Sequence, residues 1–449
     1  MKSPKMSVYA CSFVAMGAIV GLSACGTSSS GNSSKQSSNV TSSKTVTSNS
    51  GAKTTLTVLT WGNDATTNYL SQTLKTLNPK LAKQYTFKPI LAANDDTVSK
   101  YKLELSSGQT VPDIIQINAT DLPAMWNTKT ITNLTSTIKP YESDMFTATK
   151  LLVSFKGQDW GFPYQIKTKL WYYRTDMFKN AGINVNNVHT LGQFIQAGKK
   201  LQKKYPNSYI WNLGDPVASY DLGMILTGNG GEFTNSTGKF VINTNPGVKN
   251  AFVALKQLYD SGVVADTPDF TAAWTKDLAK GTIASTLSAS WLEDMLPSYA
   301  PKLAGNWGVA QWPVIAGSVG GSEAGGSVFV IPQNAPDKAA AIKVLSQMLL
   351  TKTGNIAFYK AMGQSTFVKS AQSAVEKTPN AYYGANFAKQ YNMSLKSFKE
   401  MQYDPRYTNE LTIVNQYLQL YLSGKDTLQQ ALNGAQTTAS AQIQNPWTQ

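Results

Sequence analysis

The stretch VPDIIQIN, residues 111–118, is a run of apolar, largely β-branched residues that ends in a polar tip. Two similar runs precede it, LTVLTW at 56–61 and YTFKPIL at 85–91. The segments between these runs carry apolar residues at helical spacing: Leu70, Leu74, Leu77 and Leu81 in the first, then Val98, Tyr101 and Leu105 in the second. Strands that alternate with helices predict a parallel, doubly wound α/β sheet with its ligand site beyond the carboxyl ends of the strands.

Polar and aromatic residues follow two of these strand ends. Trp61 and Asn63 come at the end of the first run, and Asn118 and Asp121 come at the end of the third. Because ligands of open α/β sheets bind outside the carboxyl ends of the strands, we expect these residues to border the binding site.

The N-terminus has the features of an exported protein. Lys2 and Lys5 precede a run of apolar and small residues, which predicts a signal peptide over residues 1–24. The run is short for a membrane-spanning helix, which needs about 20 apolar residues. The junction Leu22-Ser23-Ala24-Cys25 is similar to the lipobox of bacterial lipoproteins, which implies a diacylated Cys25 as the new N-terminus. The alternative is a simple signal peptide with a chance cysteine.

Residues 25–53 predict a disordered linker between this anchor and the folded body. After Cys25 the segment is rich in serine and threonine and has no acidic or aromatic residue, so it cannot bury enough apolar surface to fold. The chain has 2 cysteines, and Cys11 would leave with the signal peptide, so no disulfide can form within the mature chain. Two acyl chains suffice for stable anchoring, and we expect the protein on the extracellular face of the cytoplasmic membrane.

The net charge of +14 raises the question of a polyanionic partner. The lysines are spread along the chain, and no zinc-finger, RRM or helix-turn-helix pattern is present, so nucleic acid is not an expected partner. We interpret the charge as adaptation to a surface of wall polymers and anionic lipid.

From about residue 54 to the end, a series of motifs resembles family 1 extracellular solute-binding proteins, the sugar-binding components of ABC importers. SGQTVPDIIQIN resembles the family's aaGxxPDvv motif. GFPYQIKTKLWYYRTDMFKNAGI (161–183) resembles GlPyxxxtxxLyYNkdlFkkaGi, with Arg174 in place of the usual asparagine. The other matching stretches are LPAMWNTKTITNLTSTI, where Lys129-Thr130 replaces a usual glycine, TLGQFIQAGKKL (190–201), SASWLEDM (288–295), GNWGVAQWPVIAG and GGSVFVIPQNAPDKAAAIKVLSQM (325–348).

The resemblance implies a two-lobed, periplasmic-binding-protein-like α/β fold, similar to maltose-binding protein, whose lobes are joined by three crossing segments. Bending of such segments would close the lobes around a ligand. The implied boundaries are 54–163 plus 314–363 for the N-terminal lobe, 168–306 plus 369–449 for the C-terminal lobe, and 164–167, 307–313 and 364–368 for the hinge. Independently, Thr190 and Asn245-Pro246 predict helix starts, and Gly262 predicts a helix end.

The residue inventory argues against catalysis. The single histidine, His189, precedes a predicted helix cap, so neither a Ser-His-Asp triad nor a histidine metal cluster is available. Phosphate-binding glycine loops are absent as well, which leaves nucleotide hydrolysis to separate subunits. We therefore expect a protein that is not an enzyme and that has no cofactor and no metal.

A sugar site needs an aromatic plate for the C–H face of a pyranose and polar groups for its hydroxyls. Trp61 is the first plate expected, and the resemblance implies Trp291 as the family's site tryptophan. The further candidates are Asn63, Asn118, Asp121, Asp215 and Glu293 for hydroxyls, Tyr164 and Trp211 as additional aromatic surfaces, and Gly325 and Gly326 for backbone N–H groups. For any one tryptophan, the alternative to a role in the binding site is packing in the hydrophobic core.

Two functions stay open at this level. One is a lipid-anchored, monomeric receptor that binds a carbohydrate and hands it to membrane permease subunits. The other is a surface adhesin or wall-polymer-binding lipoprotein that uses its basic charge. The first predicts saturable binding of a small molecule, and the second predicts salt-sensitive binding to polyanions.

Overall fold

The computed structural model describes residues 53–61, 63–93, 96–214, 218–318, 323–363, 366–397 and 405–445. The predicted signal peptide, Cys25, nearly all of the predicted linker and the site candidate Asp215 lie outside the described residues. Among the described helices, none is both long and apolar enough to cross a membrane.

Three parallel strands open the main sheet, as the sequence predicts. β1 (Thr54–Trp61) lies between β2 (Tyr85–Ala92) and β3 (Ile114–Asn118), and it pairs with both in parallel. Val58 and Ile114 are register partners and are fully buried. Because parallel neighbours end at the same edge, Trp61 and Asn118 come to that edge together.

The first predicted helix is divided in two. The leucine pattern runs through Leu81, but α1 (Ala65–Leu77) ends before Asn78, and a short α2 (Pro79–Ala82) follows. Proline disfavours a helical conformation in the residue before it, so Pro79 breaks the helix at Asn78. The Asn78 side chain then caps α2 by accepting a hydrogen bond from the Leu81 N–H at 3.0 Å.

The rest of the sheet is antiparallel, which corrects the expectation of a wholly parallel sheet. β11 (Glu323–Val330) runs antiparallel to β3 on one side and to β6 (Phe162–Arg174) on the other. β6 follows the short β4–β5 hairpin (Ser154–Phe155 and Gln158–Asp159). Parallel strands need a long crossover between them, usually a helix, whereas antiparallel strands do not.

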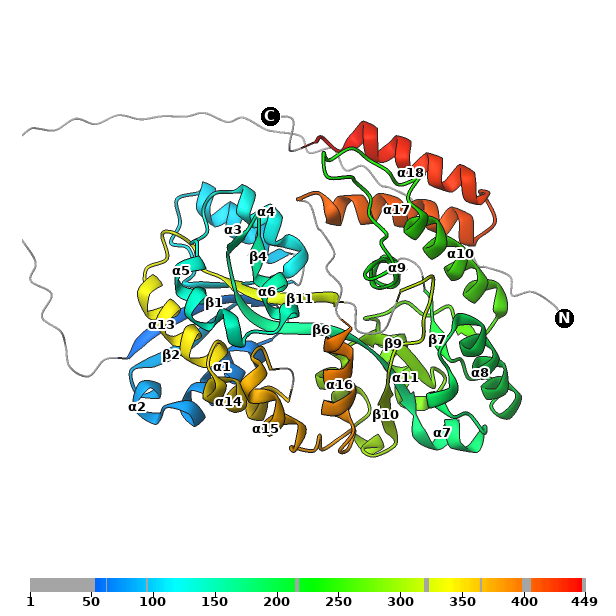
Figure 1. Cartoon of the computed structure of the whole chain (residues 1–449), viewed down its shortest axis with the longest axis horizontal. Helices are drawn as coiled ribbons and strands as arrows, with labels where there is room; N and C mark the ends of the chain where they lie inside the picture. Colours follow the sequence, from blue (N-terminus) through cyan, green and yellow to red (C-terminus); the bar gives the residue numbers. More distant parts are fainter. Residues whose placement is uncertain are drawn as a thin grey trace, which may run out of the picture. The chain divides into compact units, whose positions relative to one another are not determined.

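The 13-residue strand β6 changes partners along its length. Its first half, up to Thr168, pairs with β11, whereas Lys169 to Tyr173 pair with β9 (Ser285–Ala289). The end of β6 also pairs with β10 (Trp307–Ala310). Figure 1 shows β6 running from the strands of the first half of the chain into the β9 and β10 region. One continuous strand thus belongs to both parts of the sheet.

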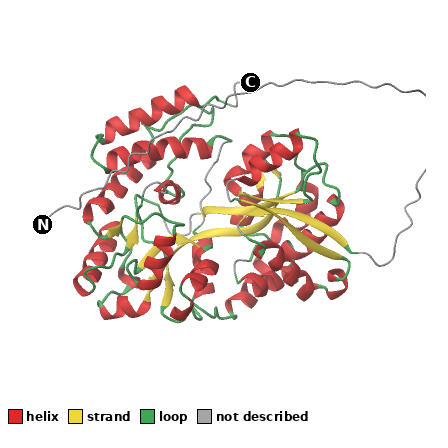
Figure 2. Ribbon diagram, turned by 180° about the vertical axis from the view of Figure 1, so that it is seen from behind, coloured by secondary structure: helices red, strands yellow, loops and turns green. Residues whose placement is uncertain are grey.

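Helices cover both sides of the strands (Figure 2). The other helices are α3 (Thr97–Ser106), α4 (Leu122–Asn127), α5 (Thr135–Ile138), α6 (Thr147–Val153), α7 (Thr175–Asn180), α8 (Leu191–Lys204), α9 (Ala218–Leu226), α10 (Pro246–Ser261), α11 (Ala272–Lys280), α12 (Leu292–Tyr299), α13 (Lys338–Leu349), α14 (Lys352–Met362), α15 (Gln372–Glu376), α16 (Phe387–Lys396), α17 (Tyr407–Leu422) and α18 (Leu428–Gln442). A two-stranded parallel pair, β7 (Trp211–Asn212) and β8 (Val264–Ala265), and the 3₁₀ turns η2 (Ala119–Asp121), η3 (Lys139–Asp144), η4 (Val185–Asn187), η5 (Pro301–Leu303) and η6 (Lys369–Ala371) complete the described elements.

The helix signals found in the sequence are confirmed. Thr190 forms a capping box with Gln193 at the start of α8. Asn245 caps α10 with Pro246 at its first position, and Gly262 ends α10 in the left-handed conformation, at φ 70°.

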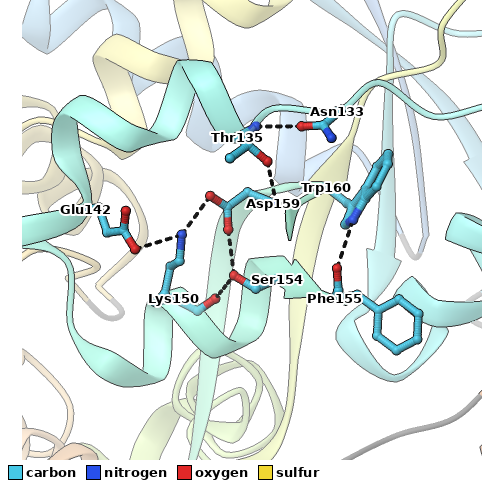
Figure 3. A network of polar contacts seen from close by, with 8 residues as sticks. All are labelled: Asn133, Thr135, Glu142, Lys150, Ser154, Phe155, Asp159 and Trp160. Atoms are coloured by element: carbon cyan, nitrogen blue, oxygen red, sulfur yellow. Dashed lines mark hydrogen bonds and ion pairs between the residues drawn. The ribbon is translucent and has the colours of Figure 1, made fainter. Parts of the chain in front are cut away.

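A buried carboxylate fixes the β4–β5 hairpin next to α6 (Figure 3). The Asp159 side chain is 1% exposed and accepts hydrogen bonds from Lys150 Nζ at 2.8 Å and Ser154 Oγ at 2.6 Å. Glu142 pairs with the same ammonium group at 3.1 Å. Burial alone would lower the pKa of Lys150, but the hydrogen bonds and charges of Asp159 and Glu142 outweigh it and raise the pKa.

Residues just after two of the predicted crossings keep contacts with the part of the chain that precedes each crossing. Val314 N donates to His189 O, and Ser318 Oγ donates to Thr227 O, so 314–318 remain bonded to the part predicted as the C-terminal lobe. Ser370 Oγ donates to Asp144 Oδ2, so 366–371 remain on the N-terminal side. These contacts favour crossings after 318 and after 371; the lobe boundaries remain predictions.

Candidate functional site

The candidate site is built on the middle of β6, where the strand changes its pairing partners. Gln165 and Lys167 are partly exposed, whereas their neighbours Ile166 and Thr168 are buried. Alternate residues of a strand point to opposite faces, so Gln165 and Lys167 share one face. This alternation of polar and apolar residues is visible in the sequence and is the signal that could have predicted Lys167 as a site residue.

Lys167 joins two of the predicted site residues. Its Nζ lies 6.0 Å from the centre of the Trp61 ring and donates a hydrogen bond to Asn118 Oδ1 at 3.4 Å. Trp61 and Asn118 are partly exposed and end the neighbouring strands β1 and β3. Together the three side chains present an indole ring, an ammonium group and an amide within one small area.

The glycine pair lies beside this group. Gly325 and Gly326 are in β11, and Gly326 is the register partner of Ile166 on β6. The pairing is irregular between Glu323 and Gly326, which is typical of a bulge at a site where the backbone approaches another group.

The other two strand-end candidates are positioned differently. Asn63 is exposed, and its Oδ1 accepts a hydrogen bond from the Ala65 N–H at 2.8 Å, so this oxygen is used in the turn before α1. Asp121 is partly buried at the end of η2, directly before α4. Both lie near the strand edge, as predicted.

A second aromatic group is attached to β6 through Ser290. Its backbone N–H donates to Thr168 O at 2.8 Å and its Oγ donates to Ile166 O at 3.1 Å. Trp291 follows directly, and its Nε1 donates to the Tyr220 hydroxyl at 2.6 Å. The Ser290 contacts therefore bring Trp291 to the same strand segment that carries Lys167.

Phe270 and Trp274 complete this group. The Phe270 ring lies 5.2 Å from Trp291 at 30°, and the Trp274 ring lies 6.3 Å from Trp291 at 45°. Trp274 is buried, whereas Phe270 is 52% exposed. Neither Tyr220 nor Phe270 was predicted from the sequence, because nothing in their local pattern distinguishes them from core aromatics.

Two buried carboxylates are sequence neighbours of members of this group, Asp221 next to Tyr220 and Asp269 next to Phe270. Asp269 is 7% exposed and accepts a hydrogen bond from Asn212 Nδ2 at 2.8 Å. Asp221 is 1% exposed, and neither of its oxygens has a hydrogen-bond partner among the described residues. Burial raises the pKa of Asp269 to about 6, partly opposed by the bond from Asn212. Burial, and then the charge of Asp269, raise the pKa of Asp221 well above its usual value.

Comparison with known proteins identifies the family. Residues 72–383 match the sequence profile of a family described as bacterial extracellular solute-binding protein. The chain belongs to this family. A family of binding proteins agrees with the prediction that the chain is not an enzyme. Within the described residues, no group of three or more potential metal ligands is present.

Two similar proteins can be compared with the chain. The arabinooligosaccharide-binding protein of Bacillus subtilis is 24% identical over 283 residues, covering 58% of this chain and 61% of that protein. The lactose-binding protein of Rhizobium radiobacter is 25% identical over 279 residues, covering 59% and 63%. The chain thus matches less than two thirds of the length of either relative.

A solved structure confirms the fold class. The ABC transporter associated binding protein from B. animalis subsp. lactis, in complex with β-1,6-galactobiose, has a TM-score of 0.71 at 20% identity, covering 86% of this chain and 97% of that one. The solute-binding protein described here therefore has the two-lobed α/β fold of periplasmic binding proteins.

Three of the predicted site residues of this solute-binding protein lie in its interior, and for Trp211 this is the core packing that the sequence left as the alternative. Trp211 is fully buried, and its ring meets Phe194 and Trp312 edge-on at 6.4 and 6.1 Å. Tyr164 is 3% exposed and packs 4.5 Å from Phe329. These positions indicate packing roles. The local sequence does not show which helices will cover an aromatic residue at one end of a strand.

Glu293 is the third interior candidate. It is 3% exposed, and its Oε1 accepts a hydrogen bond from Asn380 Nδ2 at 2.6 Å. The Tyr383 hydroxyl donates to the Glu293 backbone carbonyl at 3.3 Å. The carboxylate therefore supports the loop around Asn380, a partner 87 residues away that the local motif could not reveal.

Proposed function

We propose that this solute-binding protein takes up a carbohydrate, an oligosaccharide, between its lobes and delivers it to the permease subunits of an ABC importer. The observation that carries the proposal is the attachment of two aromatic groups to the same segment of β6: Trp61 with Asn118 through Lys167, and Trp291 through Ser290. A strand shared by both parts of the sheet is where lobes meet, and hinge closure there encloses a ligand.

The chemistry of these groups suits a sugar. Indole faces match the C–H face of a pyranose, while the ammonium group of Lys167 and the amide of Asn118 can bond to hydroxyl groups. The names of the relatives point the same way, since those proteins are described as binding arabinooligosaccharide and lactose. The family membership supports import rather than adhesion.

A thermal-shift screen of the purified protein tests this proposal. The panel contains arabino-oligosaccharides, lactose, β-1,6-galactobiose and maltose, with an anionic wall polymer in a parallel arm. A bound sugar at about 100 times its Kd stabilises the folded state by roughly 2.7 kcal/mol and raises the melting temperature. If only the wall polymer shifts the melting temperature, and salt abolishes that shift, the adhesin function replaces the importer function.

We also propose that the protein is a monomer held by diacylated Cys25 on the extracellular face of the cytoplasmic membrane. The support is the lipobox-like junction at residues 22–25 and the serine-rich segment after it. Cys25→Ser should move the protein from the membrane fraction to the medium, because both acyl chains are lost. A membrane-bound Cys25→Ser variant would contradict the anchor.

A further inference from the structure

Phe270 has a backbone conformation that is unusual for an aromatic residue. Its φ is 63°, and of the four non-glycine residues with positive φ among those described, it is the only aromatic one. Such a conformation costs about 1–3 kcal/mol for a bulky residue and persists only where the surroundings impose it.

The residues on both sides of Phe270 impose this conformation. Asp269 is buried and accepts the bond from Asn212 described above. Thr271 caps α11 by accepting from the Trp274 N–H at 3.2 Å, and its hydroxyl donates to Pro268 O at 2.8 Å. Phe270 cannot return to negative φ without breaking one of these anchors.

The Phe270 ring is the most exposed member of the aromatic group, and Trp291 is only partly exposed. Phe270 is 52% exposed, and its ring lies 5.2 Å from the Trp291 ring, tilted by 30°. Trp291 is fixed from the side by its bond to the Tyr220 hydroxyl. Tyr220 also lies edge-on to Phe270, at 5.7 Å and 79°.

We propose that Phe270 is the stacking and specificity-determining residue of this part of the site, and that Trp291 and Tyr220 are positioning residues that hold its ring. The inference rests on the proposed function, because it assigns the sugar-facing surface within the same site. A sugar ring that approaches the group then stacks on the exposed surface of Phe270, and the C–H face of the sugar must fit a single six-membered aromatic ring.

Variants at residue 270 separate binding from folding. Glycine and asparagine tolerate positive φ, so Phe270→Gly and Phe270→Asn keep the backbone while removing the ring. We expect both to bind the sugar selected from the lactose and oligosaccharide panel about tenfold more weakly, with a melting temperature equal to or above that of the wild type. Phe270→Tyr should keep the affinity within about twofold.

Trp291→Phe distinguishes the two assignments. As a positioning residue, Trp291 loses its bond to Tyr220 in this variant, so the melting temperature should fall while the affinity changes less than in Phe270→Gly. The inference is overturned if Phe270→Gly and Phe270→Asn bind like the wild type while Trp291→Phe loses binding. If the wild-type protein binds no sugar of the panel, the proposed function fails, and this inference fails with it.

Discussion

Among single residues, Asp221 and Asp269 stand out, since both carboxylates are buried and no cation pairs with them among the described residues. Burial raises the pKa of both, that of Asp269 to about 6. Their usual value in an unfolded chain is about 3.9. Between these values the folded state binds more protons than the unfolded state, so the free energy of unfolding decreases as pH rises.

We therefore expect this contribution to stability to be complete below about pH 4 and to be lost as pH rises through about 6. Relative to the double variant Asp221→Asn/Asp269→Asn, the wild type should lose on the order of 1–3 kcal/mol between pH 4 and pH 7. Urea unfolding at several pH values measures this, with the exposed Asp260→Asn as a control. Parallel pH profiles of wild type and double variant would refute the expectation.

The position of a single residue can be predicted when the contacts that fix it come from residues nearby in the sequence. Trp61 and Asn118 follow from the strand pattern, because parallel strands deliver their ends to one edge. Trp211 begins the two-residue strand β7 and is enclosed by Phe194 and Trp312, which lie 17 and 101 residues away in the chain. Phe270 owes its exposure to anchors on Asn212 and α11, and no local signal predicts it.

At the scale of elements, the first three strands and the caps of α8 and α10 could be predicted because each depends on local signals. The antiparallel pairing of β11 with β3 and β6 could not, since it joins segments about 160 to 210 residues apart and nothing in a strand's own pattern fixes its partner. The division of α1 from α2 was readable from Pro79.

The β4–β5 hairpin provides a prediction at this scale. Asp159→Ala removes the buried acceptor of Lys150, while the Ser154 hydroxyl keeps the Lys150 carbonyl as an acceptor, so we expect a loss of about 2–4 kcal/mol in the free energy of unfolding. Glu142 is the more exposed partner of Lys150, since its side chain is 47% exposed. Glu142→Gln should therefore lower the free energy of unfolding by less than about 1 kcal/mol. Denaturant titrations of both variants check this; equal losses would show that the buried carboxylate has no special role.

For the whole molecule, we propose that β6 carries a sugar site from one lobe into the other. The family and the two-lobed fold could be predicted because several motifs occur in the right order along the chain. The crossing points stay predictions, because the contacts that bear on them, such as Ser318 with Thr227 and Ser370 with Asp144, join residues distant in the sequence.

Calorimetric titration of the selected sugar into the wild type and into Trp61→Ala tests the central claim most directly. We predict one sugar molecule per chain and about tenfold weaker binding to Trp61→Ala. Trp126→Ala, which removes a partly exposed tryptophan packed on Phe155, should bind like the wild type. Binding that is unchanged in Trp61→Ala, or the absence of any saturable heat with every sugar of the panel, would contradict the account.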